Sequence, residues 1–284
     1  MSLYTSVSNP VYDSATKQGN IQENWIAQLF HQDSYLSLDG TDDLVNLGTT
    51  TGSSTMALDN SDDLTVAFWI NFPTLGAVEW IFANNSQTNY SGVFIYKGSG
   101  NVIRIGWGDN TGSTSSDRES MGGGTALSAN TWYFIVITTD FSLTTTNTVI
   151  KINNSSETVS NSGTSGGTNP IYGTGTAQFG KRGSDYGEFQ IRNFGIWAGE
   201  LNSNNLTALY NSGNYFSFLE DSGNYNQSSA LKGYWEFNNG ENTIQDKTGN
   251  GANGTLSGAL YGDFLPISLT DTTVDSIFYH GVIT

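Results

Sequence analysis

Residues 130–140 read Asn-Thr-Trp-Tyr-Phe-Ile-Val-Ile-Thr-Thr-Asp, an uninterrupted run of β-branched and aromatic residues between polar turn formers. The run is too short for a typical helix and matches a strand that is buried on both faces. We therefore expect a central strand here, with residues 148–153 as its hairpin partner. Further strands of similar composition should stack around it.

Short apolar runs separated by Gly, Asn and Ser clusters continue in both directions, with the spacing of an antiparallel β-sandwich. The sequence predicts a hairpin whose strands, at 35–38 and 44–48, flank a turn at 39–43. It predicts polar loops at 49–62, 109–124 and 154–176. One helix is expected near 201–210, capped by Asn202 or Ser203 and stopped at Gly213. The other expected strands are 64–72, 79–83, 93–96, 102–107, 177–180, 188–197, 231–237 and 255–256.

The formal net charge is −16, from 26 acidic and 10 basic residues, which opposes binding to nucleic acid and to anionic membranes. The absence of cysteine excludes disulfides, thiolate zinc sites and cysteine nucleophiles. The chain shows neither a signal-peptide pattern at its start nor an apolar stretch of membrane-spanning length, so we expect a soluble protein without membrane insertion. A surface rich in Ser, Thr, Asn and Gly is typical of extracellular and virion proteins.

Five stretches resemble the laminin-G-like, or concanavalin A-like, lectin and glucanase superfamily. They are Leu-Asp-Gly-Thr-Asp-Asp-Leu-Val at 38–45, Leu-Thr-Val-Ala-Phe-Trp-Ile at 64–70, Trp-Tyr-Phe-Ile-Val at 132–136, Ile-Arg-Asn-Phe-Gly-Ile-Trp at 191–197 running into Leu-Asn-Ser at 201–203, and Tyr-Trp-Glu-Phe at 234–237 with Asp-Lys-Thr-Gly-Asn-Gly at 246–251. The resemblance implies an all-β, concanavalin A-like jelly-roll β-sandwich of two antiparallel sheets with one short helix.

Two features depart from the pattern of that superfamily. The strand and turn at 234–251 usually open the domain but close it here, which a circular rearrangement explains because domain termini often lie close together. Arg192 and Asn193 replace an acidic pair that members usually carry, so any role of that pair is lost.

The flanks, at 12–25 and 271–281, resemble segments of virion proteins of marine bacteriophages that carry lectin-like modules between assembly segments. We therefore divide the chain into an N-terminal arm (1–32), a sandwich (33–262) and a C-terminal tail (263–284). In the arm, Ile21, Trp25 and Leu29 have helical spacing, so this piece either folds back onto the sandwich or docks on a partner chain. These terminal arms imply a homo-oligomer, contacts with other virion subunits and a location in the virion; an extracellular location is the alternative.

Catalysis is not expected. Glucanases of this fold need closely spaced carboxylates on one strand, whereas Glu79 and Glu188 each stand alone in theirs. His31 and His280 lie outside the expected sandwich, which disfavours a Ser-His-Asp triad.

The resemblance implies a structural Ca²⁺ near the Gly-rich turn, with Asp246 and Asn250 as its ligands, and hard cations prefer such oxygen ligands. The alternative is that Asp246 only caps the turn through the backbone. Asp39, Asp42 and Asp43 are expected to form a solvated turn.

Sugar binding on a sandwich needs aromatic faces flanked by polar side chains. The candidate glycan contacts are the aromatic residues in or beside the Gly/Asn-rich loops: Trp80, Tyr90, Tyr96, Trp107 and Tyr186. For Trp80 and Trp107, packing in the core is an equal alternative. The tryptophans within strand patterns are expected in the core: Trp69, Trp132, Trp197 and Trp235.

Together these features predict a non-enzymatic virion structural protein whose lectin-like carbohydrate-binding module attaches a phage tail or fibre to cell-surface glycans through many weak contacts. One alternative is a capsid or tail decoration protein that makes only protein–protein contacts. The other is a glycan hydrolase of the glucanase superfamily.

Overall fold

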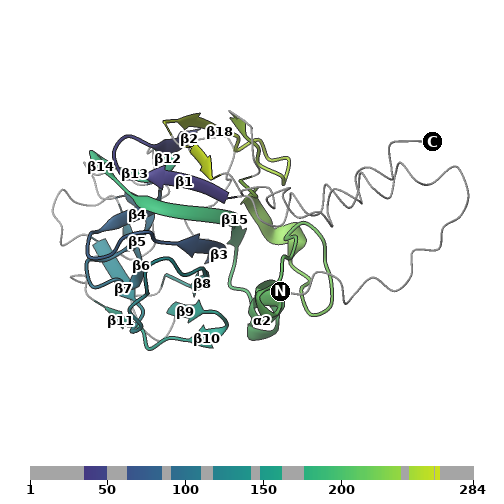
Figure 1. Cartoon of the computed structure of the whole chain (residues 1–284). Coiled ribbons are helices and arrows are strands. Elements are labelled where there is room, and N and C mark those ends of the chain that lie inside the picture. The colour runs from purple at the N-terminus through teal and green to yellow at the C-terminus, as the bar shows by residue number, and fades with distance from the viewer. Residues whose placement is uncertain are drawn as a thin grey trace, which may run out of the picture.

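The computed structural model describes residues 35–49, 63–84, 91–109, 118–141, 148–161, 176–237, 243–258 and 260–262. Two antiparallel sheets pack as two layers (Figure 1). The first runs in the order β10 (Ser155–Ser156), β9 (Thr148–Ile152), β8 (Tyr133–Thr139), β3 (Leu64–Asn71), β15 (Glu188–Ala198), β1 (Tyr35–Asp39) and β19 (Leu260–Gly262), and β16 (Leu231–Trp235) also pairs with β15.

The second sheet runs in the order β11 (Ser160–Asn161), β7 (Arg118–Gly122), β6 (Ile103–Asp109), β5 (Ser91–Lys97), β4 (Glu79–Ala83), β12 (Thr176–Phe179), β2 (Leu44–Thr49), β18 (Gly254–Ser257) and β17 (Thr243–Ile244). A separate hairpin joins β13 (Lys181–Arg182) to β14 (Asp185–Tyr186). The helical elements are α2 (Ser203–Tyr210), η3 (Asn211–Gly213) and η4 (Ser228–Ala230). The predicted all-β sandwich with one short helix is confirmed.

The central run forms β8, which is buried on both faces as predicted and pairs with β9 and β3. Its alternate residues enter two different cores. Ile135 and Ile137 face the main core between the sheets, whereas Phe134 and Val136 face a second core beneath α2. Because both faces are covered, the strand needs apolar residues at every position.

The hairpin predicted at 35–48 is wrong. β1 pairs with β15 and β19 in the first sheet, whereas β2 pairs with β12 and β18 in the second. The turn is therefore a corner that carries the chain from one sheet to the other. Leu38 and Val45 enter the main core from opposite layers, which drives the crossing.

The polar stretches at 109–124 and 154–176 are not wholly loops, because they contain β7, β10 and β11. Met121 of β7 is fully buried. The helix begins as predicted, since the side chain of Asn202 accepts hydrogen bonds from the backbone N–H groups of Asn204 and Asn205 at 3.0 and 3.1 Å. Its end was misplaced: the left-handed cap residue is Asn211 (φ 45°), two residues before Gly213.

The expected arm at 1–32 and tail at 263–284 lie outside the described residues. In the part of the chain that the structure describes, no helix has the length and apolar character needed to span a bilayer.

Candidate functional site

Aromatic residues predicted as glycan contacts meet on the outer face of the second sheet. The strand registers place Trp80 of β4 opposite Tyr96 of β5, and Tyr96 opposite Arg104 of β6. The neighbouring residues Ile81 and Ile95 belong to the main core, so this row points away from it. All three side chains of the row are half-buried, and the ring centroids of Trp80 and Tyr96 are 5.0 Å apart.

A guanidinium group and a third ring extend the row. Phe94 lies 5.9 Å from Trp80, ring to ring, and the guanidinium carbon of Arg182 lies 4.5 Å from the Trp80 ring centroid and 4.3 Å from that of Phe94. In the same β13–β14 hairpin, Nζ of Lys181 donates a hydrogen bond to the Tyr186 hydroxyl at 2.7 Å. We call these residues the aromatic face: Trp80, Phe94, Tyr96, Arg104, Lys181, Arg182 and Tyr186.

Two glycines let the aromatic face assemble. A Cβ at Gly187 would lie 2.7 Å from the backbone oxygen of Trp80, so only glycine allows the chain after β14 to pass this close to β4. A Cβ at Gly122 would lie 2.9 Å from the guanidinium carbon of Arg104, so the arginine lies across β7 where a larger residue would displace it. The Tyr96 hydroxyl is held by Ser120 Oγ at 2.8 Å.

The aromatic face is a basic region of an acidic chain. Arg104, Lys181 and Arg182 are three of only ten basic residues, in a chain of net charge −16. One acid, Asp185, stands opposite Arg182 in the β13–β14 register. Cations held over ring faces gain electrostatic attraction from the rings, which fixes their position.

The structure thus brings together two of the five predicted glycan contacts, Trp80 and Tyr96, and places a third, Tyr186, on the hairpin that passes close to β4. Trp107 is fully buried and packs against Phe141 at 5.1 Å between ring centroids, which is the core packing that the sequence left as its alternative. Trp107 is therefore not available to stack on a sugar. Tyr90 lies outside the described residues. The sequence offered no signal for Arg104 or Arg182, because strand register alone places them.

The tryptophans predicted to lie in the core differ in how deeply they are buried. Trp69, Trp197 and Trp235 are buried, as predicted. Trp132 is half-buried, so its assignment to the core holds only in part. It precedes β8 and packs against the second core from the margin of the sheet, where it is only partly covered.

Comparison with protein families gives a match for residues 39–207, more than half of the chain, to the concanavalin A-like lectin/glucanases superfamily. The chain belongs to this superfamily. No curated protein matches the sequence. Among solved structures, a presumed carbohydrate binding protein from Bacteroides ovatus is similar in fold, with a TM-score of 0.52 and 14% identity over 81% of this chain. The aligned region spans 60% of that protein's length.

Two further structures are similar at lower scores. A heptameric pentraxin from Limulus polyphemus shares 14% identity, with a TM-score of 0.48 over 82% of this chain and 95% of its own. The binding domain of botulinum neurotoxin DC, solved in complex with SialylT, shares 23% identity, with a TM-score of 0.39 over 55% of this chain and 36% of its own.

The superfamily resemblance implied calcium at Asp246, and the surroundings of this carboxylate can be tested for that role. Its Oδ1 accepts hydrogen bonds from the backbone N–H of Tyr234 (3.1 Å) and from both the N–H and the hydroxyl of Thr248 (3.0 and 2.7 Å), while Oδ2 accepts from the N–H of Ala252 (3.2 Å). A carboxylate has about four acceptor positions, and the turn fills them. Asn250 directs its amide nitrogen at Lys232 O. These residues fit a turn cap and do not fit a cation ligand set.

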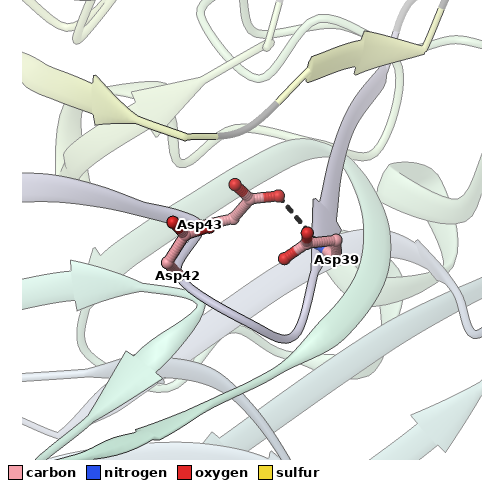
Figure 2. A group of neighbouring side chains, drawn as sticks. All are labelled: Asp39, Asp42 and Asp43. Carbon is pink, nitrogen blue, oxygen red and sulfur yellow. Dashed lines mark hydrogen bonds between the residues drawn. The ribbon is translucent and has the colours of Figure 1, made fainter.

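A second acidic group lies at the corner between β1 and β2. One carboxylate oxygen each from Asp39, Asp42 and Asp43 lies within 4.8 Å of the others. Figure 2 shows the three side chains at this corner. Asp43 is not solvated as expected: it is buried, and its Oδ2 accepts the Asp39 N–H at 2.8 Å. Burial raises the pKa of Asp43, and the charges of Asp39 and Asp42 add to this.

Glu79 and Glu188, which stand alone in the sequence, meet in the structure. Oε2 of Glu79 accepts the backbone N–H of Glu188 at 2.7 Å, and the Thr74 hydroxyl donates to Glu188. Burial raises the pKa of Glu79, although the nearby Lys97 ammonium opposes this. Lys97 is fully buried and donates to Ala77 O at 2.7 Å. Only 4% of Glu79 is exposed, so its carboxylate does not lie open to a substrate.

Proposed function

We propose that the protein is a non-enzymatic glycan-binding module and that its aromatic face binds the glycan. The observation that carries the proposal is the half-buried row of Trp80, Tyr96 and Arg104 on one sheet face. Aromatic rings pack against the C–H faces of pyranose rings, and flanking guanidinium and hydroxyl groups form hydrogen bonds with sugar oxygens.

The charges of the aromatic face favour an acidic glycan, one that carries carboxylate or sulfate groups. Arg104 and Lys181 are half-exposed, so their charged groups can reach a bound anion. Arginine binds carboxylate and sulfate with paired, charge-assisted hydrogen bonds. The negative charge of the chain outside the aromatic face repels an acidic glycan, so the glycan is confined to this face.

The proposed setting is a virion that attaches to cell-surface glycans through many copies of a weak site. This part of the proposal rests on the resemblance of 12–25 and 271–281 to phage virion segments, which lie outside the described residues. Repetition of a weak site on one particle raises its overall affinity by orders of magnitude. The covered position of Glu79 supports the absence of hydrolysis.

The test is a glycan-array screen of the full chain, multimerised on beads, at low and at raised ionic strength. We expect saturable binding to acidic glycans that weakens with salt, because exposed charges are screened. Trp80→Ala and Arg104→Gln should each weaken it about fivefold or more, whereas Lys232→Gln, which removes the same charge from β16, should not.

Binding that is unchanged in Trp80→Ala and Arg104→Gln would place the site elsewhere. No saturable binding by folded protein would remove the glycan function and favour a decoration protein that contacts only other subunits. Release of sugar products from a bound polysaccharide would overturn the non-enzymatic part of the proposal.

A further inference from the structure

At one end of the outer face of the first sheet, several polar and aromatic side chains lie at or beyond the margin of the second core among the described residues, and no part of the function above explains them. Toward its other end, α2 packs on this face through the second core, and Tyr210 stacks on Trp69 at 6.3 Å between ring centroids. Beyond Trp69 the strands carry polar and aromatic side chains. We call this group the amide patch: Tyr35, Ser37, Asn71, Trp132, Gln190 and Arg192.

Amide and hydroxyl groups form a row across three strands of the patch. Ser37 of β1 stands opposite Gln190 of β15, which stands opposite Asn71 of β3. Nδ2 of Asn71 donates a hydrogen bond to Oε1 of Gln190 at 2.9 Å. This bond orients the Gln190 side chain so that its own N–H donors remain for a further partner.

An acceptor in this row lacks a donor. Asn71 is 7% exposed, and its Oδ1 is buried without a hydrogen-bond partner. A buried carbonyl oxygen that gives up water without gaining a donor destabilises the folded chain, and such groups are rare. A ligand that turns the Asn71 amide outward and donates an O–H group to this oxygen would remove that cost.

Aromatic side chains border the row. The guanidinium carbon of Arg192 lies 5.1 Å from the Trp69 ring centroid and 5.0 Å from that of Trp132. Tyr35 meets Trp132 edge to face at 5.5 Å, and both are half-exposed. The patch therefore offers apolar ring surface next to fixed hydrogen-bonding groups, the combination that sugars require.

The charges of the patch differ from those of the aromatic face. Glu188 and Asp39 stand opposite each other at the end of the same sheet face and offset the charge of Arg192. A neutral ligand fits these charges better than an anion. We propose that the amide patch is a second saccharide site, specific for neutral pyranoses, on the opposite sheet from the aromatic face. Each chain would then bind two glycan units at once, whatever the aromatic face binds.

Saturation-transfer NMR on the full chain tests this proposal, with methyl glucopyranoside, methyl mannopyranoside and methyl galactopyranoside as probes. We expect saturable transfer from at least one probe. Gln190→Glu keeps the acceptor for Asn71 Nδ2 but removes the free amide donors, so it should weaken binding about fivefold or more while the melting temperature changes little. Ser37→Ala, which leaves the Asn71–Gln190 bond intact, should weaken it too.

Gln178→Glu, the same substitution on β12 of the other sheet and outside the aromatic face, serves as the matched control and should leave this binding unchanged. Failure of the aromatic face would appear as lost binding of acidic glycans, so the two proposals fail separately. Wild-type affinity in both Gln190→Glu and Ser37→Ala overturns the amide patch, as does the absence of saturable transfer. A concentration-dependent dimer that Trp132→Ala abolishes would also overturn it, because a second copy of the chain would then occupy the patch.

Discussion

Replacing Asp246 by alanine should destabilise the fold strongly, because one carboxylate organises the turn between β17 and β18. Four donors would lose their acceptor, and two of them, the N–H groups of Tyr234 and Ala252, are buried. A hydrogen bond to a charged acceptor contributes about 1.5–3 kcal/mol, but the four share one group and are not additive. We therefore expect the free energy of unfolding to fall by about 3–5 kcal/mol, and the melting temperature by about 10 °C.

Urea unfolding followed by tryptophan fluorescence measures this loss. Trp235 is a suitable reporter, because its indole N–H donates to Ala252 O at 2.8 Å, within the turn. The control is Asp185→Ala, which removes an exposed carboxylate from β14 and should change the free energy of unfolding by less than about 0.5 kcal/mol.

The same experiment with and without a chelator separates the turn cap from a calcium site. We expect chelation to leave the stability of the wild-type chain unchanged. The reasoning is refuted if Asp246→Ala costs less than about 1 kcal/mol. It is also refuted if chelation lowers wild-type stability by as much as the substitution does and has no effect on the variant.

Three further substitutions test other parts of the structure. Gly187→Ala should lower the free energy of unfolding by about 2 kcal/mol in a urea titration, because its Cβ would overlap the backbone of Trp80, and an unchanged midpoint would contradict that contact. Asn202→Ala should cost about 1 kcal/mol through loss of the helix cap, measured in the same way. Burial raises the pKa of Asp43 above its ordinary 3.8, so its charge opposes folding above the folded-state pKa, and this penalty disappears as the pH falls below 3.8. Asp43→Asn should therefore raise the melting temperature at pH 7 but not at pH 3; a lower melting temperature at pH 7 would show that the charge stabilises the corner.

The strands with the clearest sequence patterns were those buried on both faces. β3 and β8 carry apolar residues on both sides because the second core covers the outer face of their sheet. β7 escaped prediction because its five residues, Arg-Glu-Ser-Met-Gly, include one large apolar side chain, Met121. Its pairing with β6 places it, and no local pattern reports that pairing.

The corner at 39–43 shows a limit of local turn chemistry. Asp and Gly residues favour a tight turn whether the flanking strands pair with each other or enter different sheets. Leu36 and Leu38 of β1, like Val45 and Leu47 of β2, are apolar at every second position and enter the core. This pattern is the same for a hairpin and for a corner between two sheets. The choice depends on the partners β15 and β12, which lie more than 120 residues later in the sequence.

Part of the aromatic face could be anticipated from the sequence, because Trp80, Tyr96 and Tyr186 lie beside loops. Trp107 could not be distinguished from them, because the sequence of its strand does not show whether its side chain points into the core or outward. The basic residues of the site belong to β6 and to the two-residue strand β13, and only tertiary pairing brings them to the rings of Trp80 and Tyr96.

The indole N–H signals of the protein give the most direct test of glycan binding at the aromatic face. The chain has 7 tryptophans, and Trp80→Phe assigns one of their signals in a ¹H–¹⁵N spectrum. During titration with the acidic glycan that binds best on the array, the Trp80 signal should shift saturably, while those of the buried Trp107, Trp197 and Trp235 stay in place. A saturable titration in which the Trp80 signal does not move would contradict the central claim.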